Sequence, residues 1–394
     1  MAKILIVGKY YHPFRGGIEA NTASVAELLA QSHQVTALVN RHAPDARDEV
    51  INGVQVIRKP VEITVKNQPL ALGLFRGVDL ADYDVIHFHA PNPYVAALLW
   101  TKLFLGGIKT PLVITHHMEI YGRKLLREAS IGFYRWLARR ARSVIVTSKK
   151  NADISLDLPK GIKTTVIPLG IDEDNYVVTD QIRAEGRAWR AELAGDAPMI
   201  GFLGRHARYK GLDVLMKALA EMPGVHAAIA GDGPERAGAE QLVQTLELAD
   251  RVHFLGKIND DDKLRMLSTI DAFAFPSTEI TEAFGVSQLE AMLCGAPVVA
   301  TDLPTGVTDV AIHEETALLA APGSVESLTA QLRRMIDDRA LASTLAENGR
   351  RHVLVNMSEQ VVARRTCDVI ERAARGGPRS GAPANRAVAD QAAV

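Results

Sequence analysis

The 394-residue sequence has few cysteines and almost no net charge. Only Cys294 and Cys367 occur, which excludes a disulfide framework and indicates a reducing compartment. The formal net charge is −1, so the charge balance gives no indication of nucleic-acid binding. No uninterrupted apolar run reaches the about 18 residues that a membrane span needs. The opening MAKILIVGK lacks the cleavage site of a signal peptide, so we expect a first strand and a cytoplasmic protein.

Short apolar runs alternate with helical patterns along the chain, which predicts parallel sheets covered by helices. Apolar residues make up 47% and charged residues 23%, as in globular proteins, and the length suits two domains. The runs of the first half are 3–8, 34–39, 54–58, 84–89, 111–116, 143–148 and 164–169. Those of the second half are 199–204, 226–231, 252–256, 272–277, 297–301 and 317–322.

The two series predict two doubly wound α/β domains in tandem. We expect an N-terminal domain over residues 1–170 and a C-terminal domain over 171–354. A helix near 355–375 is expected to pack back on the first domain. Residues 376–394 are rich in Ala, Arg, Gly and Pro, which predicts a disordered tail. Ligands of such sheets bind beyond the carboxyl ends of the strands, so the loops after the apolar runs are the candidate site.

The strongest motif is TEAFGVSQLEAMLCGAPVVAT at 281–301. Glu282 and Glu290 stand eight residues apart, and a helix is expected from about Val286 to Cys294. Its start offers free backbone N–H groups and the positive end of a dipole, which bind phosphate. Gly285 would let a ligand approach the backbone closely. An amphipathic helix with two solvated glutamates would give the same pattern.

This segment resembles the E-x7-E motif of retaining family-4 glycosyltransferases. That family has the GT-B fold, in which two Rossmann-like domains face each other across a cleft. The resemblance implies that Glu282 contacts the transferred hexose and Glu290 the nucleotide ribose. It also implies that backbone N–H groups between them meet hexose hydroxyls and the β-phosphate, namely those of Ala283, Phe284, Gly285, Val286 and Ser287.

A basic loop, GRHARYKG at 204–211, lies between a predicted strand and a predicted helix. Arg205 and Lys210 could meet a diphosphate from the same side as the helix N-terminus. Solvated surface charge is the alternative explanation. The loop resembles the R-x4-K element of the same family, which implies that both residues neutralise the leaving diphosphate.

Two segments of the first half are further candidates. Gly16 and Gly17 precede a helix expected over Ile18–Gln31, where paired glycines often form only a tight turn. In the family, the corresponding glycines reach toward the donor phosphates. His116 and His117 end a strand and point to opposite faces of it. The family spacing to a following acid, Glu119 here, favours His117 as a hydrogen-bond donor to sugar or acceptor.

Other polar residues receive smaller roles. By resemblance, the backbone near Lys257 and Ile258 reads the edge of the nucleotide base, and the GDGPE turn at 231–235 lies near the nucleotide. Asp172 and Asp174 form a D-x-D pair, for which a helix cap or hinge is the preferred interpretation. We expect no metal site, no required metal and no cofactor beyond the nucleotide-sugar substrate. His87 and His89 are interpreted as packed strand-end histidines, with His89 a weaker acceptor-site candidate.

Residues 123–142 carry seven Lys/Arg and one Glu, a net charge of 7 − 1 = +6, together with Leu125, Leu126, Phe133, Trp136 and Leu137. A basic amphipathic helix can lie on an anionic membrane surface, which would make the protein peripheral at the inner face of a membrane. A helix packed on the first sheet, with a solvated arginine face, is the alternative.

The resemblance implies a retaining hexosyltransferase that moves a sugar from a nucleotide diphosphate to an acceptor hydroxyl, and we expect it to be metal-independent. The sequence around 281–307 resembles that of bacterial mannosyl- and rhamnosyl-type transferases of polysaccharide or glycolipid assembly. It therefore favours GDP-mannose or a similar donor, with a UDP-sugar as the alternative, and a lipid-linked or saccharide acceptor. A nucleotide-sugar-binding protein or epimerase that transfers nothing is the alternative from another class.

Overall fold

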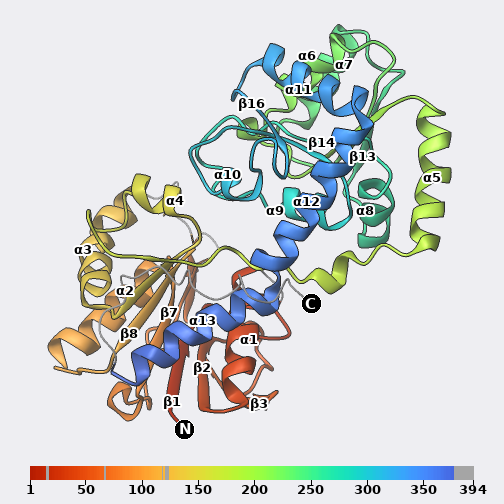
Figure 1. The fold of residues 1–394 in the computed structure, drawn as a ribbon. Coiled ribbons are helices and arrows are strands. Elements are labelled where there is room, and N and C mark those ends of the chain that lie inside the picture. Colours follow the sequence, from red (N-terminus) through yellow and green to blue (C-terminus); the bar gives the residue numbers. More distant parts are fainter. Residues whose placement is uncertain (15–16, 66–67, 118, 120–123, 377–394) are drawn as a thin grey trace. The chain divides into compact units, whose positions relative to one another are not determined.

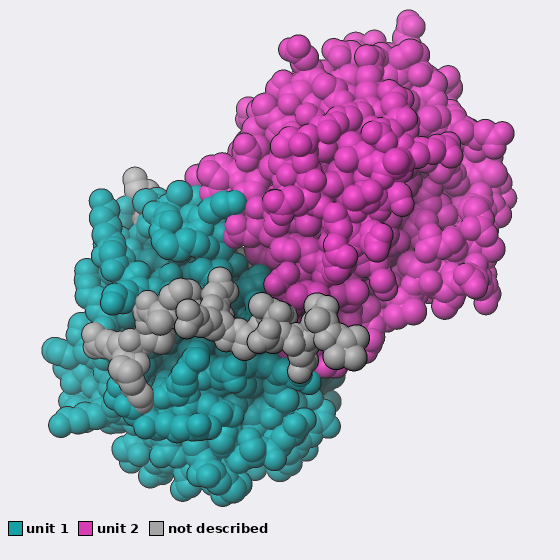
Figure 2. Space-filling view, in the orientation of Figure 1, with its two compact units in different colours: residues 1–168, 362–394 teal, residues 169–361 magenta. Residues whose placement is uncertain are grey.

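The computed structural model describes residues 1–14, 17–65, 68–117, 119 and 124–376. Gly16 and the predicted tail after Gly376 therefore lie outside the described residues. The chain forms two compact units, coloured separately in Figure 2. The first unit contains Met1–Pro168 and takes up the chain again at Val362, whereas the second contains Leu169–Val361. The return to the first unit thus begins later than the expected boundary after residue 354.

The first unit is built around an eight-stranded sheet (Figure 1). Its order is β10-β9-β8-β7-β1-β2-β4-β3, and every pair is parallel except the antiparallel β3 and β4. The strands are β1 (Lys3–Val7), β2 (Gln34–Asn40), β3 (Glu49–Ile51), β4 (Val54–Lys59), β7 (Val85–Ala90), β8 (Leu112–His116), β9 (Ser143–Val146) and β10 (Thr165–Val166). A separate hairpin joins β5 (Ile63–Val65) to β6 (Gln68–Leu70).

Helices cover both faces of this sheet because successive strand residues point to opposite sides. In β1, Leu5 and Val7 enter one apolar cluster, and Ile4 and Ile6 enter the other. The first cluster also holds residues of α2 and α3, and the second holds residues of α1 and α13. The helices are α1 (Gly17–Ala30), η1 (Leu80–Asp82), α2 (Pro93–Trp100), the π-helix η2 (Thr101–Leu105), α3 (Lys124–Arg140), α4 (Lys149–Ile154) and α13 (Glu359–Ala374).

The second unit has a six-stranded, fully parallel sheet of order β13-β12-β11-β14-β15-β16. Numbered along the chain within the unit, this is the 3-2-1-4-5-6 order of the Rossmann fold, and the strand order reverses between β11 and β14. The strands are β11 (Met199–Leu203), β12 (His226–Ala230), β13 (Val252–Gly256), β14 (Ala272–Phe275), β15 (Val298–Thr301) and β16 (Leu318–Ala320).

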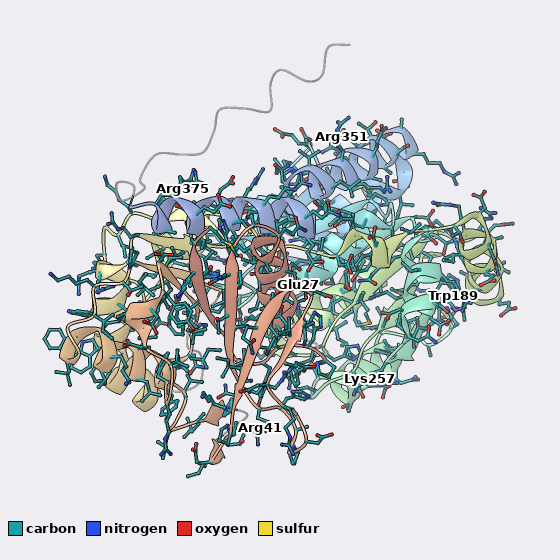
Figure 3. All side chains as sticks on the ribbon, turned by 90° about the horizontal axis from the view of Figure 1, so that it is seen from below. Glu27, Arg41, Trp189, Lys257, Arg351 and Arg375 are labelled. Atoms are coloured by element: carbon teal, nitrogen blue, oxygen red, sulfur yellow. The ribbon has the colours of Figure 1, made fainter. Side chains whose placement is uncertain are left out.

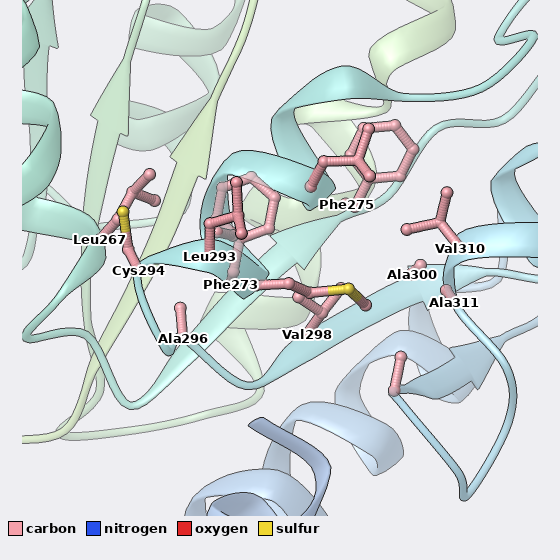
Figure 4. Packing of buried hydrophobic residues seen from close by; sticks show 14 of the residues in the cluster. Leu267, Phe273, Phe275, Leu293, Cys294, Ala296, Val298, Ala300, Val310 and Ala311 are labelled. Atoms are coloured by element: carbon pink, nitrogen blue, oxygen red, sulfur yellow. The ribbon is translucent and has the colours of Figure 1, made fainter. Parts of the chain in front are cut away.

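Two apolar clusters fill the space on either side of this second sheet. Figure 4 shows one of them, in which Phe273 and Phe275 of β14 pack with Leu293 and Val298. The alternate β14 residues Ala272 and Ala274 belong to the other cluster. The helices are η3 (Glu173–Tyr176), α5 (Asp180–Ala194), η4 (Arg208–Lys210), α6 (Leu212–Ala220), α7 (Arg236–Thr245), α8 (Asp260–Leu267), α9 (Val286–Leu293), α10 (Val307–Val310), α11 (Val325–Asp337) and α12 (Arg339–Met357).

All thirteen apolar runs named in the sequence analysis contain strands. The stretch 170–195 has no regular strand, but it contains helix α5, which its many charges conceal in the sequence. Trp189 of α5, labelled in Figure 3, packs against the apolar cluster of Figure 4. Arg190 of the same helix forms an ion pair with Asp271, with 2.6 Å between Nη2 and Oδ2. Segment 170–195 is thus part of the second unit's packing.

Candidate functional site

A pocket lies in the second unit, at the carboxyl ends of its strands. Its volume is about 900 Å³, and it spans the loops after β11, β12 and β13 and the start of α9. In a doubly wound fold, ligands bind beyond the carboxyl ends of the strands, near the point where the strand order reverses. The lining residues are Leu203, Gly204, Arg205, Gly231, Asp232, Gly233, Lys257, Ile258, Asp260, Lys263, Ser287 and Glu290.

The loops after β11 and β12 pack backbone to backbone at the base of this pocket. Gly231 has a φ of +118°, and a Cβ atom there would lie 1.9 Å from the carbonyl oxygen of Gly204. Any side chain would therefore push the two loops apart. The Gly231 N–H donates to the carbonyl of Gly256, with 2.7 Å between the atoms, which joins the third loop as well. The GDG turn therefore lines the pocket.

Arg205 and Lys210 leave the same loop but have different environments. Arg205 is exposed and lines the pocket, and within the described residues it forms no ion pair. Lys210 ends η4, and only 12% of its side chain is exposed. Its Nζ atom lies 2.5 Å from Oε2 of Glu282 and 5.2 Å from the centre of the Phe275 ring. The sequence motif is thus one solvent-facing guanidinium and one ammonium already paired with a carboxylate.

Glu282 is buried, with 8% of its surface exposed. Its Oε2 atom accepts a hydrogen bond from the Ser277 hydroxyl (3.0 Å) in addition to its ion pair with Lys210. Across the described residues, no protein group donates to the second oxygen, Oε1. The carboxylate is therefore fixed through one oxygen, and the other keeps its capacity to accept a hydrogen bond from a ligand.

The turn before α9 needs a glycine for a different reason than the sequence analysis gave. Gly285 has a φ of +79°, and a Cβ atom there would lie 2.4 Å from Cζ of Phe275. Packing over the β14 aromatic ring thus requires this glycine, independently of any ligand. Val286 then starts α9, and the following Ser287 lines the pocket. The Ser287 hydroxyl is buried, and no described residue is its hydrogen-bond partner, so it is a further donor for a phosphate oxygen.

Glu290 lines the pocket from the second turn of α9. Its Oε1 atom accepts a hydrogen bond from the Tyr176 hydroxyl at 2.6 Å and lies 3.3 Å from Nζ of Lys263. Sequence reasoning missed both partners. Tyr176 belongs to a charged segment without a motif, and Lys263 follows the acidic run 260–262.

The other predicted donor residues divide into two groups. Lys257, labelled in Figure 3, and Ile258 follow β13 and line the pocket. Ala283, Phe284 and Val286 do not line it: the Phe284 side chain belongs to the apolar core, and the Val286 side chain is 48% exposed. Any contact of these three with the donor would therefore use backbone N–H groups, as the resemblance implies.

Within the first unit, Gly17 is the first residue of α1. A Cβ atom at Gly17 would have no described atom within 4 Å, so packing does not require a glycine there. This leaves room beside the start of the helix, although Gly16 lies outside the described residues.

A cluster of buried histidines lies at the carboxyl ends of β7 and β8. His89 and His117 stack nearly parallel, at 8°, with 2.9 Å between Nδ1 of His89 and Nε2 of His117. His87 bonds the Thr115 hydroxyl at 2.8 Å. Burial, followed by the charge of neighbouring histidines, lowers the pKa of His87 and of His117 to about 3 and lowers that of His89 as well. All three are therefore neutral imidazoles at neutral pH.

The acid whose spacing favoured His117 contacts the neighbouring histidine. Glu119 lies 3.2 Å from Nε2 of His116, not His117, and it accepts backbone N–H bonds from Leu156 and Asp157. A lone acid two residues after a histidine does not reveal which of two adjacent rings it meets. The Nδ1 atom of His117 is buried and has no partner in the described chain. His117 thus remains a candidate on its own geometry, with His89 as its partner.

The D-x-D pair is a helix cap, as expected. Asp172 accepts from the backbone N–H of Asp174 and from the Asn175 side chain at the start of η3. Across the residues that the structure describes, no group of three or more His, Cys, Asp or Glu side chains could hold a metal ion. In the same residues, no helix is both long and apolar enough to cross a membrane.

Comparison with known proteins identifies the family. Residues 187–352 match the family model "Glycosyl transferases group 1", and residues 15–175 match "Glycosyltransferase Family 4". The chain is 30% identical over 346 residues to D-rhamnosyltransferase WbpZ of Pseudomonas aeruginosa, covering 84% of this chain and 86% of the relative. It is 25% identical over 384 residues to a GDP-mannose-dependent alpha-(1-6)-phosphatidylinositol monomannoside mannosyltransferase of Mycobacterium tuberculosis, covering 94% and 98% of the two chains.

The fold is shared with solved structures of more distant proteins. The Anabaena protein HepE, crystallised in complex with UDP, superposes with a TM-score of 0.72 at 23% identity over 94% of this chain and 99% of HepE. The chain therefore belongs to the family-4 glycosyltransferases and has their GT-B fold of two Rossmann-like domains. It is a glycosyltransferase, and the pocket of the second unit is its candidate donor site.

Proposed function

We propose that this enzyme transfers a mannose-type hexose from a GDP-sugar to an acceptor hydroxyl, with retention at the anomeric carbon. The product would belong to a bacterial cell-surface polysaccharide or glycolipid. The proposal rests on the set of charged and polar groups around the pocket of the second unit. Arg205, Ser287 and Glu290 line it, and the paired Lys210 and Glu282 lie on two of the same loops.

The chemistry of the leaving group suits this arrangement. Breaking the glycosidic phosphate bond leaves negative charge on the β-phosphate. Arg205, the Ser287 hydroxyl and the N-terminus of α9 offer donors to that charge without reorganisation, since the helix and its loop are fixed by packing. Lys210 adds a positive charge whose present partner is Glu282. When a hexose reaches Glu282, the ammonium can be shared between the carboxylate and the phosphate.

The base end of the pocket favours guanine. Asp260 lines the pocket beside Lys257 and Ile258, and its side chain is 90% exposed, so a ligand can reach it. Guanine carries N1–H and N2–H donors side by side, which a carboxylate accepts together, whereas uracil offers one N–H between two carbonyl oxygens. The mycobacterial relative named above is GDP-mannose-dependent by its name, which supports the same donor. UDP is the second candidate, because HepE, a protein of the same fold, holds it.

Retention and metal independence are parts of the same proposal. A double displacement needs a carboxylate on the opposite face of the sugar, and the sequence offers no clear candidate. We therefore propose reaction on one face, with the leaving phosphate assisting deprotonation of the acceptor. Arg205 and Lys210 supply the charge that a metal ion would otherwise supply. Two measurements check this: the anomeric configuration of the product by NMR, and turnover in excess EDTA, which we expect to be undiminished.

We further propose that the acceptor is lipid-linked or a saccharide and that the enzyme works at the inner face of a membrane. The predicted surface needs correction, because Leu137 is fully buried and Arg140 donates to the Ile108 and Thr110 carbonyls. The side chains of Leu125 and Leu126 lie outside the described set. The exposed apolar residues are instead Phe104 (53%) and Leu105 (67%) of η2. Lys102 of η2 and Arg139 of α3 are also exposed. The surface therefore combines apolar and basic groups.

The aromatic residues of this surface form one cluster of ring contacts. Phe104 stacks on Trp100 with 5.1 Å between ring centres and meets Trp136 of α3 edge-on at 5.5 Å. Phe133 of α3 lies 4.8 Å from the Trp100 ring. Phe133 and Trp136 of α3 therefore pack on α2 and η2, and membrane contact would be made by the tip of η2.

Titration calorimetry with GDP-, UDP- and ADP-sugars tests the donor most economically. We expect heat of binding with GDP-mannose, weaker heat with UDP-glucose and none with ADP-glucose. Tight binding of a UDP-sugar with none of a GDP-sugar would replace the donor in the proposal. Failure of every nucleotide sugar to bind would contradict the assigned pocket.

A further inference from the structure

Glu290, Tyr176 and Lys263 form a closed triangle of contacts in the wall of the pocket. The Tyr176 hydroxyl donates to Oε1 of Glu290 at 2.6 Å, and Nζ of Lys263 lies 3.3 Å from the same oxygen. Nζ of Lys263 also lies 5.0 Å from the centre of the Tyr176 ring. Each of the three side chains thus contacts the other two, and only 16% of Glu290 and 16% of Lys263 is exposed.

Both donors act on one oxygen of the carboxylate. Within the described part of the chain, no group donates to Oε2 of Glu290, although the residue lines the pocket. A glutamate side chain is free to sample several rotamers, and fixing it costs conformational entropy. Because Tyr176 and Lys263 fix it before a ligand arrives, binding does not have to order it. The free oxygen can then accept hydrogen bonds from a neighbouring pair of hydroxyls.

The protonation states of the two donors are secured by their surroundings. Burial first, and Glu290 second, raise the pKa of Tyr176, so its hydroxyl remains a donor across the working pH range. Burial lowers the pKa of Lys263, but Glu290 and Asp260 outweigh this and raise the pKa overall. Lys263 therefore stays charged and remains a donor to Glu290.

The donors come from different parts of the second unit. Tyr176 lies in η3, in the charged stretch that follows the chain's passage from the first unit, whereas Lys263 lies in α8. Neither belongs to the E-x7-E segment. The rotamer of Glu290 is thus set by two elements outside the motif, and both have further roles in packing α9 and α8 against the core.

We propose that Tyr176 and Lys263 are positioning residues that hold Glu290 for the ribose diol and so make the site selective for ribonucleotides. This inference rests on the proposed function, in which Glu290 meets the ribose. The two residues touch no reacting atom. The effect of the Tyr176 hydroxyl passes through the carboxylate, so it should disappear when the ligand has no diol to offer.

The test compares a nucleoside diphosphate with its 2′,3′-dideoxy form, using the full chain and titration calorimetry. GDP is the first probe and UDP the second. We expect Tyr176→Phe and Lys263→Gln each to weaken ribonucleotide binding about tenfold, as for a lost hydrogen bond to a charged group. Tyr176→Phe should leave the Kd of the dideoxy form unchanged to within about twofold. Lys263→Gln should weaken the dideoxy form less than the ribo form, because it also removes the charge paired with Asp260. Lys217→Gln, which removes an exposed lysine paired with Asp213 on α6, is the matched control and should change neither value.

A double-mutant cycle separates this role from a general structural one. On a Glu290→Gln background, Tyr176→Phe should produce no further loss of ribonucleotide binding. Equal weakening of the ribo and dideoxy forms by Tyr176→Phe, or an additive loss in the double variant, would overturn the inference while leaving the donor site intact. Wild-type protein that binds GDP or UDP without discriminating against the dideoxy form would also overturn it. Absence of binding by either nucleotide would instead contradict the proposed function on which it rests.

Discussion

Lys210 and Glu282 form a nearly buried ion pair, with 2.5 Å between Nζ and Oε2. The same oxygen accepts a hydrogen bond from Ser277. Glu290, eight residues further on, is held in the same chemical way, by the hydroxyl of Tyr176 and the ammonium of Lys263. Both glutamates of the motif are therefore neutralised and oriented by one hydroxyl and one lysine each. An anionic donor meets two carboxylates whose charge is already balanced.

Ser277 provides a test of this preorganisation at the sugar end. Ser277→Ala removes one donor to Glu282 without changing the charge of the site. We expect the kcat for glycosyl transfer to fall by about tenfold. The Kd for the nucleoside diphosphate, which lacks the hexose, should not change. Ser343→Ala, at an exposed site on α12, is the control. Equal losses in kcat and in diphosphate binding would place Ser277 outside the proposed role.

Asp260 provides a test of base recognition. Asp260→Asn replaces an acceptor-only group by one that also donates, so binding of GDP should weaken about tenfold while that of UDP changes little. The matched control is Asp261→Asn, an exposed aspartate in the same first turn of α8 that does not line the pocket. Titration calorimetry with GDP and with UDP gives the ratio of their two Kd values directly. An unchanged GDP-to-UDP ratio in Asp260→Asn would contradict guanine recognition by this carboxylate.

The buried histidines predict a pH dependence of stability. Burial lowers the pKa of His87 from 6.5 to about 3. Between these values the unfolded chain binds a proton at this position that the folded chain does not bind, so stability falls as the pH falls below 6.5. His87→Asn should therefore flatten the decline of Tm between pH 7 and pH 5, whatever its effect on Tm at pH 7. Parallel Tm profiles of variant and wild type would show that His87 does not contribute.

The tip of η2 provides a test of membrane contact. Phe104→Ser combined with Leu105→Ser should abolish most sedimentation with vesicles that contain anionic lipid, because the two exposed side chains supply the apolar area. Leu72→Ser is the matched control, since Leu72 is 71% exposed elsewhere in the first unit. Neutral vesicles should retain much less of the wild-type protein. Equal, negligible binding of wild-type protein to both kinds of vesicle would contradict peripheral association.

Much of the fold was predictable because it depends on local patterns. Most of the parallel strands are buried on both faces and so appear as short apolar runs. Such runs located every strand of both large sheets except the edge strand β3. The antiparallel strands β3, β5 and β6 were not predicted because each is a three-residue segment outside any longer apolar run. Helix α5 was missed for a different reason: its charged residues conceal the few that pack, such as Trp189.

Only those residues of the site that belong to a recognisable sequence motif could be predicted. Arg205, Lys257, Ser287 and Glu290 line one pocket because their loops follow neighbouring parallel strands or start the following helix. The side chains that orient them were not predictable, since Tyr176 lies 114 residues from Glu290 in the sequence. The role of Gly285 also depends on a distant residue, the Phe275 ring beneath it. Contacts of this kind arise from tertiary packing, which spacing alone does not encode.

The most direct test of the central claim is turnover with GDP-mannose and a lipid-linked or saccharide acceptor, followed as release of GDP and formation of glycosylated product. Wild-type enzyme should form product with the donor's anomeric configuration. Lys210→Ala and Glu282→Ala should each lower kcat about a hundredfold or more, with the fold intact by circular dichroism. Near-normal turnover in both variants would contradict the account, because the ion pair and its pocket would then not be where the sugar is transferred.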